Sequence, residues 1–93
     1  VTAQQASEWG MIWEAVDDDT FDGHWRGRAE QLAKGPSVAF RNVKSALRQS
    51  WDNDLSAQLL LEATLQGECG KTRDFKEGVL AFVEKRPAKY EGR

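Results

Sequence analysis

The sequence predicts a mainly α-helical fold of four to five short helices with one short strand that lacks a partner. Apolar residues recur at helical spacing over most of the chain, and glycine and proline divide it into segments of helical length. Only residues 11–16 have the consecutive bulky apolar residues of a buried strand. A chain of 93 residues forms one small domain and buries only about 60% of its unfolded surface. We therefore expect a marginal core.

The first segment predicts a capped helix followed by the strand. Thr2 and Gln5 have the spacing of a capping box, and Gly10 can adopt the left-handed conformation that ends a helix. The run MIWEAV at 11–16 suits a strand buried on both faces. Because a lone strand leaves its backbone groups unpaired, the sequence predicts a sheet partner outside this chain.

Two amphipathic helices follow. The second is expected to begin near Asp19 or Thr20 and to run to Lys34, where the pair Gly35-Pro36 stops it. The third starts at Ser37. Its apolar arc contains Ala39, Phe40, Val43, Ala46, Leu47 and Trp51, and basic residues lie on its other side. Each of these helices therefore has one face that it must bury.

The fourth helix differs because apolar residues surround most of its axis. We expect Asp54 to cap it and the helix to run to about Cys69. The apolar positions are Leu55, Leu59, Leu60, Leu61, Ala63, Leu65 and Cys69. A helix of this kind requires contacts on more than one side. An oligomer interface or a further domain is the expected cover.

The fifth helix is expected to begin after Thr72, its N-cap, and to end at Pro87. Its apolar stripe consists of Phe75, Val79, Phe82 and Val83. Gly78 in mid-helix costs about 1 kcal/mol relative to alanine, which suggests that a neighbouring group approaches closely there. The residues after Pro87 are expected to form an extended tail.

Charge is distributed unevenly along the chain. The net charge is -2, yet residues 71–93 contain seven basic and four acidic residues. This basic end suits either an anionic ligand or a solvated helix terminus. The acidic chain has no basic stripe with interleaved aromatics, which argues against a nucleic-acid partner. No apolar run approaches the length of a membrane span, and the single Cys69 suits a reducing, cytoplasmic compartment.

The sequence offers no catalytic or metal-binding constellation. His24 has no second histidine or nearby cysteine with which to bind zinc, and it is expected to be an inert surface residue. Cys69 lacks a histidine base and is expected to act as a small apolar residue. The GKT at 70–72 lacks the upstream glycine of a phosphate-binding loop.

Several stretches nevertheless resemble the C-terminal part of the crotonase superfamily, the enoyl-CoA hydratase/isomerase family. They are TAQQASEWGMIWEAVDDD, AEQLAKGPSVAFRNVKSAL and LLLEATLQGECGKTRDFKEGVLAFVEKRPAKYEGR. The resemblance spans essentially the whole chain. Its ending is the most specific part, with agreement at Thr72, Asp74, Glu77, Gly78, Ala81, Phe82, Lys85 and Arg86. The QLLLE and DF variants are most similar to the ring-epoxide isomerase branch of phenylacetate catabolism.

The resemblance implies a fold and a reaction for a longer protein. Residues 1–19 would end the crotonase β/α spiral core, and residues 20–93 would form the helical trimerisation region. The substrate would be an acyl-CoA thioester, with no further cofactor, and the protein would assemble as a trimer or a dimer of trimers. The oxyanion hole and the acid/base carboxylates of the family precede the position of Val1. We therefore expect a missing N-terminal core and no catalytic residue within this chain, which begins without an initiator Met.

By the same resemblance, Phe82 and Lys85 would bind coenzyme A. An aromatic face can contact the adenine and an ammonium can contact a phosphate. Phe82 also fits the apolar stripe of its helix, so a core role is an equal alternative at this stage. Lys85 is not needed by that stripe.

Two other functions remain open from the sequence. The chain could be a freestanding helical protein-interaction module that descends from such a C-terminal region, or a small regulatory bundle that binds another protein. The freestanding module would need its own start codon, a self-sufficient core and a polar replacement for the unpaired strand, whereas the regulatory bundle rests only on the broad apolar surface. The apolar MIWEAV segment favours the enzyme interpretation.

Overall fold

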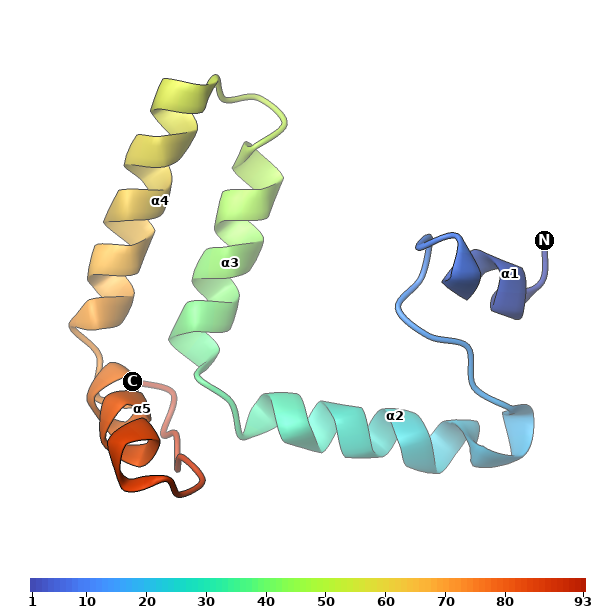
Figure 1. The fold of residues 1–93 in the computed structure, drawn as a ribbon. Helices are drawn as coiled ribbons and strands as arrows, with labels where there is room; N and C mark the ends of the chain where they lie inside the picture. The colour runs from blue at the N-terminus through green and yellow to red at the C-terminus, as the bar shows by residue number, and fades with distance from the viewer. The chain divides into compact units, whose positions relative to one another are not determined.

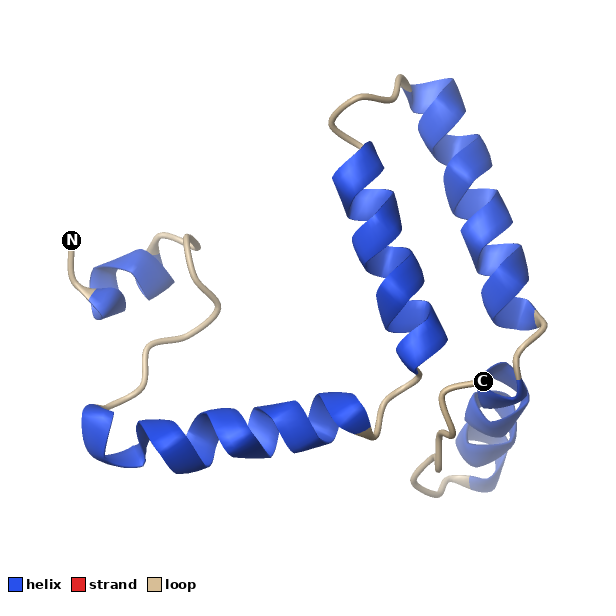
Figure 2. Cartoon of the chain, turned by 180° about the vertical axis from the view of Figure 1, so that it is seen from behind, coloured by secondary structure: helices blue, strands red, loops and turns tan.

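The computed structural model describes residues 1–93 and contains five α-helices (Figure 1). They are α1 (Ala3–Glu8), α2 (Asp18–Ala33), α3 (Ser37–Gln49), α4 (Leu55–Gly70) and α5 (Arg73–Glu84). No strand is formed (Figure 2). The mainly α-helical class is therefore confirmed. The chain divides into two compact units, Val1–Glu30 and Gln31–Arg93.

The predicted strand is the one element that does not form. Residues 11–13 bend, and residues 14–17 have no regular secondary structure. A strand is defined by its hydrogen bonds to a neighbour, and this chain supplies no second extended segment to provide them. The prediction of a strand at 11–16 is therefore wrong for this chain, because the chain contains no second extended segment with which these residues could pair.

Local capping signals set the helix starts as expected. The side chain of Thr2 accepts a hydrogen bond from the Gln5 N–H in a complete capping box. Asp54 accepts from the Ala57 N–H at 2.8 Å, and Thr72 accepts from the Phe75 N–H at 3.0 Å. Each cap satisfies a backbone donor that has no partner within its own helix.

In the second unit, α3 and α4 run antiparallel and side by side, and α5 packs on α4 (Figure 1). The α3–α4 contact contains a buried polar link. The Asn42 amide nitrogen donates to the Leu65 carbonyl at 3.1 Å and to Glu68 Oε2 at 3.2 Å. Asn42 is only 5% exposed. This asparagine therefore fixes the position of α3 along α4.

A backbone turn at Lys85 ends α5, two residues before Pro87. Lys85 lies in the left-handed region with φ 53°. The Lys85 N–H bonds to the Phe82 carbonyl, and the Arg86 N–H bonds to the Ala81 carbonyl at 3.0 Å. These two bonds form a Schellman motif. The expectation that Pro87 terminates this helix is corrected, because the turn at Lys85 has already ended it.

The chain buries very little apolar surface on its own. Ala81 is its one buried apolar residue, and the other two buried residues, Asn42 and Asp74, are polar. The apolar stripes predicted for α2, α3 and α5 are largely exposed, as is the broad apolar surface of α4. No helix is both long and apolar enough to cross a membrane.

Candidate ligand groove at the C-terminal helix

An apolar groove of about 400 Å³ lies in the second unit, where the start of α3 and the end of α4 meet α5. Most of its lining comes from α5 and from the chain that follows it. The residues that line it are Pro36, Val38, Ala39, Cys69, Thr72, Asp74, Phe75, Gly78, Val79, Phe82 and Tyr90. Because the lining is mostly apolar with few polar groups, the groove has the character of a small-molecule site.

The structure places both residues that the sequence singled out at the C-terminal end of α5. Phe82 lines the groove and is 85% exposed. Residues 1–93 by themselves do not bury the Phe82 side chain. Lys85 is also exposed.

Lys85 holds a conformation that most side chains avoid. A left-handed conformation costs a non-glycine residue on the order of 1 kcal/mol, and glycine is the usual occupant of this position in a Schellman motif. Lysine offers the helix end no compensating packing here, since its side chain is exposed. A cost of this kind suggests a use for the ammonium group itself.

The residues after Pro87 were expected to be an extended tail, and they fold back onto α5 through hydrogen bonds to Asp74 and Glu77. We call residues 86–93 the strap. The Asp74 carboxylate accepts the Glu91 N–H at 2.7 Å and the Gly92 N–H at 2.9 Å, while the Asp74 N–H donates to the Arg93 carbonyl at 2.9 Å. Asp74 is 4% exposed. The strap is therefore fixed through its backbone.

A second carboxylate holds the beginning of the strap. Glu77 binds the Arg86 guanidinium through both of its oxygens and also accepts the Lys89 N–H at 2.8 Å. These bonds, that from Arg86 above all, lower the pKa of Glu77 from 4.5 to about 2. The same pairing with Glu77, supported by Glu84, raises the pKa of Arg86. The bonds from Arg86 and Lys89 thus favour the ionised form of Glu77.

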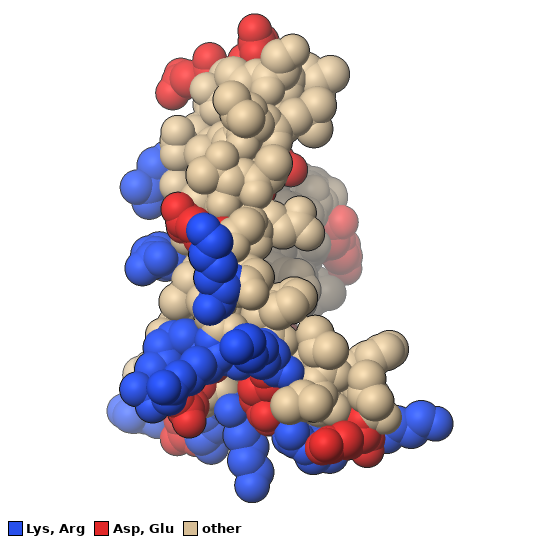
Figure 3. Space-filling model, turned by 90° about the vertical axis from the view of Figure 1, so that its left-hand side faces the viewer, with Lys and Arg blue, Asp and Glu red and all other residues tan.

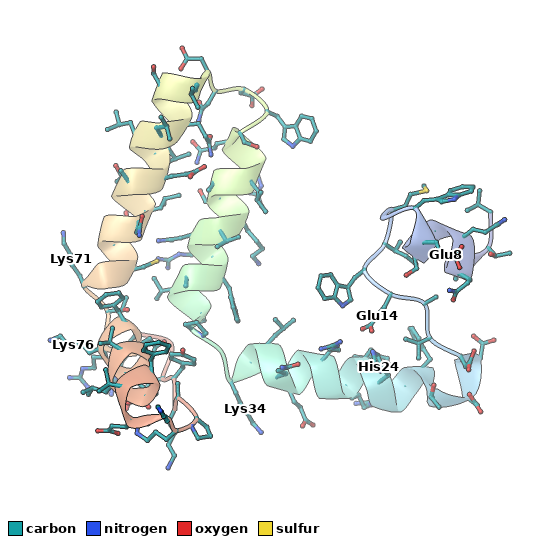
Figure 4. The ribbon with its side chains drawn as sticks, in the orientation of Figure 1. Glu8, Glu14, His24, Lys34, Lys71 and Lys76 are labelled. Atoms are coloured by element: carbon teal, nitrogen blue, oxygen red, sulfur yellow. The ribbon has the colours of Figure 1, made fainter.

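Every side-chain carboxylate in residues 71–93 has a hydrogen-bond or ion-pair partner within this segment. Asp74 is bound to backbone N–H groups, Glu77 and Glu84 bind Arg86, and Glu91 binds Arg93. The remaining five cations of residues 71–93 form no ion pair, and they are Lys71, Arg73, Lys76, Lys85 and Lys89. Figure 3 shows Lys and Arg side chains gathered at the α5 end, and Lys71 and Lys76 project to the same side in Figure 4. The surface around α5 is therefore positively charged.

His24 is less isolated than the sequence suggested. Its Nε2 lies 2.7 Å from Glu14 Oε1, which also accepts from Arg28 Nε at 3.2 Å (Figure 4). Hydrogen bonds from His24 and Arg28 lower the pKa of Glu14. This cluster attaches the irregular segment at 14–17 to α2 within the first unit.

Sequence reasoning missed Asn42, Asp74 as a strap anchor, and Tyr90. Each acts through a partner far away in the chain, and single-sequence periodicity contains no signal for such pairs. Cys69 was expected to be a small apolar residue, and it is half-buried in the groove lining, 3.5 Å from the Asn42 amide nitrogen.

Comparison with known proteins gives one consistent family. The family model described as Enoyl-CoA hydratase/isomerase matches residues 1–93. A Rhodobacter capsulatus protein described as a probable enoyl-CoA hydratase is 55% identical over the whole chain, which spans 36% of that protein. The 1,2-epoxyphenylacetyl-CoA isomerase of Escherichia coli is 39% identical over the whole chain, again spanning 36% of that protein. The chain therefore spans about a third of the length of these curated relatives.

Solved structures agree with the sequence matches. An enoyl-CoA hydratase from Bacillus anthracis aligns with all of the chain at a TM-score of 0.85 and 30% identity, with 36% of that protein covered. An enoyl-CoA hydratase/isomerase from Mycobacterium paratuberculosis aligns at a TM-score of 0.87 and 29% identity, with 37% covered. The chain thus aligns in full with part of larger proteins of this kind.

Proposed function

The chain belongs to the enoyl-CoA hydratase/isomerase family, and from that membership we propose that it is the oligomerisation and CoA-covering part of an acyl-CoA hydratase or isomerase. It corresponds to the helical C-terminal part of proteins of this family. On this proposal the catalytic carboxylates and the oxyanion hole lie in a preceding core, which stabilises a thioester enolate. Residues 1–19 complete that core, and residues 20–93 assemble the oligomer.

The observation that carries the CoA-covering role is the pairing of an exposed aromatic ring with a strained, unpaired cation. Phe82 lines the groove with its ring 85% exposed, and Lys85 follows in a left-handed conformation without an ion pair. A coenzyme A nucleotide presents a flat base and several phosphate charges. Phe82 supplies the face for the base, and Lys85 supplies the charge for a phosphate.

A binding measurement tests this role on the product of the complete gene. Butyryl-CoA is a suitable probe because its saturated acyl group cannot be hydrated. By titration calorimetry, we expect Phe82→Ala to weaken binding roughly tenfold, since stacking on a base contributes on the order of 1–3 kcal/mol. Lys85→Ala should weaken it about three- to tenfold.

Matched controls separate these effects from general damage. Val83→Ala truncates the exposed neighbour of Phe82, and Lys44→Ala removes an exposed lysine on α3 that does not line the groove. Both should bind butyryl-CoA like the parent. Unchanged affinity in Phe82→Ala and Lys85→Ala together would contradict the CoA-covering role.

The oligomerisation role rests on the uncovered surface of α4. Leu55, Leu59 and Leu60 are exposed on a helix whose apolar residues surround most of its axis. Such a surface is stable in water only when another surface packs on it. We propose that second and third copies of the chain provide that surface, in a trimer or a dimer of trimers.

Light scattering on the complete gene product tests the assembly. We expect a mass of three or six subunits, and Leu60→Lys should reduce it, because a charge would be buried in the interface. A monomer that nevertheless binds butyryl-CoA would contradict the assembly and leave the CoA-covering role standing. A monomer without thioester binding would instead favour a freestanding helical interaction module.

The reaction is best sought with two substrates. The Rhodobacter capsulatus relative favours enoyl-CoA hydration, and the Escherichia coli relative favours isomerisation of a ring epoxide in phenylacetate catabolism. We propose hydration of an enoyl-CoA as the first assay and ring-epoxide isomerisation as the second. The composition, with one cysteine, suits action in the cytoplasm.

A further inference from the structure

The strap places an aromatic side chain over the groove. Tyr90 lines the groove from the strap, together with residues from the start of α3 and from α5. It passes close to the helix at Gly78, where an added Cβ would lie 3.4 Å from the Tyr90 hydroxyl oxygen. Tyr90 is therefore the neighbour of Gly78, at a distance that would bring an added Cβ into ordinary van der Waals contact. The strap forms one wall of the groove.

The Tyr90 side chain is half-buried and lies beside Gly78, and the hydrogen bonds that hold this residue in the strap come from the backbone around it. Its place follows from the backbone of the next two residues, whose N–H groups are both bound by the Asp74 carboxylate. Asp74 is almost fully buried and also bonds to Arg93 through its own N–H. Asp74 therefore holds the backbone on the C-terminal side of Tyr90, while Glu77 accepts the N–H of Lys89 on its N-terminal side, so the buried Asp74 carboxylate helps to determine where the Tyr90 ring stands.

We propose that the strap is part of the ligand site: Tyr90 forms a wall of the groove that receives the flat base of the CoA nucleotide, and Asp74 is the positioning residue that holds this wall. The inference rests on the proposed CoA-covering function. The groove then has three exposed or half-exposed aromatic residues within one apolar lining: Phe75 and Phe82 from α5, and Tyr90 from the strap. The five unpaired cations of the same segment suit the phosphates of that nucleotide.

The experiment compares two probes on the complete gene product. Butyryl-CoA carries the nucleotide, whereas butyryl-pantetheine has the same thioester arm without it. We expect Tyr90→Ala to weaken butyryl-CoA binding roughly tenfold, as removal of a base-stacking ring does, and to leave butyryl-pantetheine binding unchanged. Tyr90→Phe should bind both probes like the parent, because the ring forms the wall and the hydroxyl does not.

A double-mutant comparison tests the role of Asp74. Asp74→Asn replaces one acceptor oxygen with an amide that cannot accept an N–H, so butyryl-CoA binding should weaken several-fold. In the Tyr90→Ala background, the same Asp74→Asn change should have no further effect on binding, since its effect acts through the ring. A full additional loss in that background would overturn the positioning role.

A second variant, Gly92→Ala, tests the strap independently in case Asp74→Asn fails to fold. Gly92 has φ +78°, and an added Cβ would lie 2.7 Å from Ser37 Oγ. Gly92→Ala should therefore shift the strap while every groove side chain is retained. It should reproduce the selective loss of butyryl-CoA binding, with circular dichroism checking that the helices persist.

The outcomes separate this inference from the proposed function. If the parent prefers butyryl-CoA and loses that preference in Phe82→Ala and Lys85→Ala but keeps it in Tyr90→Ala, the strap inference is wrong and the CoA-covering role stands. If the parent binds both probes equally, the nucleotide is not recognised and both fail. Selective loss in Tyr90→Ala, with rescue in Tyr90→Phe, supports both.

Discussion

Arg86 and Glu77 form a two-pronged ion pair that joins the strap to α5. Arg86 Nη1 lies 2.6 Å from Glu77 Oε1, and Nη2 lies 3.0 Å from Oε2. The planar guanidinium matches the carboxylate plane, a fit that lysine does not provide. Through this pair, the first residue of the strap is fixed to the middle of the helix that precedes it.

This pair predicts a loss of stability in acid. The pKa of Glu77 is lowered from 4.5 to about 2, chiefly by the Arg86 hydrogen bonds. A carboxylate whose folded-state pKa is depressed stabilises the fold above its unfolded pKa, and this stability is lost as pH falls toward the folded value. We expect the melting temperature to fall between about pH 4.5 and pH 2. Thermal unfolding followed by circular dichroism at a series of pH values measures this.

Glu77→Gln is the matched variant for the acid transition. Its glutamine keeps the size of the side chain and has no carboxylate to protonate, so the decline over this pH interval should be shallower than in the parent. Arg86→Lys should also make the decline shallower, because lysine keeps the positive charge but cannot form the two parallel hydrogen bonds of the guanidinium. Parallel pH profiles for the parent and Glu77→Gln would contradict the assignment.

The α3–α4 link gives a second prediction. Asn42 is buried and donates to the Leu65 carbonyl and to Glu68. Asn42→Ala leaves these acceptors without their donor, which should lower the free energy of unfolding by about 1–3 kcal/mol. Denaturant titration measures the loss. Gln49→Ala, which removes only an exposed bond to Ser45, should change stability little, and equal losses in the two variants would contradict the assignment.

Gly78 gives a third prediction, in the stabilising direction. Alanine is favoured over glycine in a helix by about 1 kcal/mol. An added Cβ would meet Tyr90 at 3.4 Å, which is an ordinary van der Waals contact. We expect Gly78→Ala to raise the melting temperature slightly, whereas Gly78→Leu should displace Tyr90 and lower it. A destabilised Gly78→Ala would show that Tyr90 packs more tightly on the helix than the structure indicates.

The sequence predicted those features that depend on neighbouring residues. The caps at Thr2, Asp54 and Thr72 were expected from residues within one turn of each helix start, and the structure confirms all three. The start of α3 at Ser37 follows the Gly35-Pro36 break in the same way. Local hydrogen bonding and backbone restriction determine such points, so no knowledge of packing was needed.

Features that depend on distant residues were not predicted. The Asp74 carboxylate binds N–H groups 17 and 18 residues further along the chain, and nothing in the helical period indicates this. The strand at 11–16 was predicted from its apolar run, and it fails to form because pairing needs a partner segment. Phe82 and Lys85 were found through resemblance to a family, and their role in binding stays a prediction.

Lys85 gives the last prediction, which separates stability from binding. Glycine adopts the left-handed conformation without steric cost, so Lys85→Gly should relieve the strain at φ 53° and raise the free energy of unfolding by about 1 kcal/mol. The same change removes the ammonium group and should weaken butyryl-CoA binding about three- to tenfold. Lys85→Ala is the control, since it loses the charge and keeps the strain. Denaturant titration and calorimetry on the two variants measure both effects. A Lys85→Gly protein that is more stable and binds as the parent does would show that the lysine is not kept for a ligand.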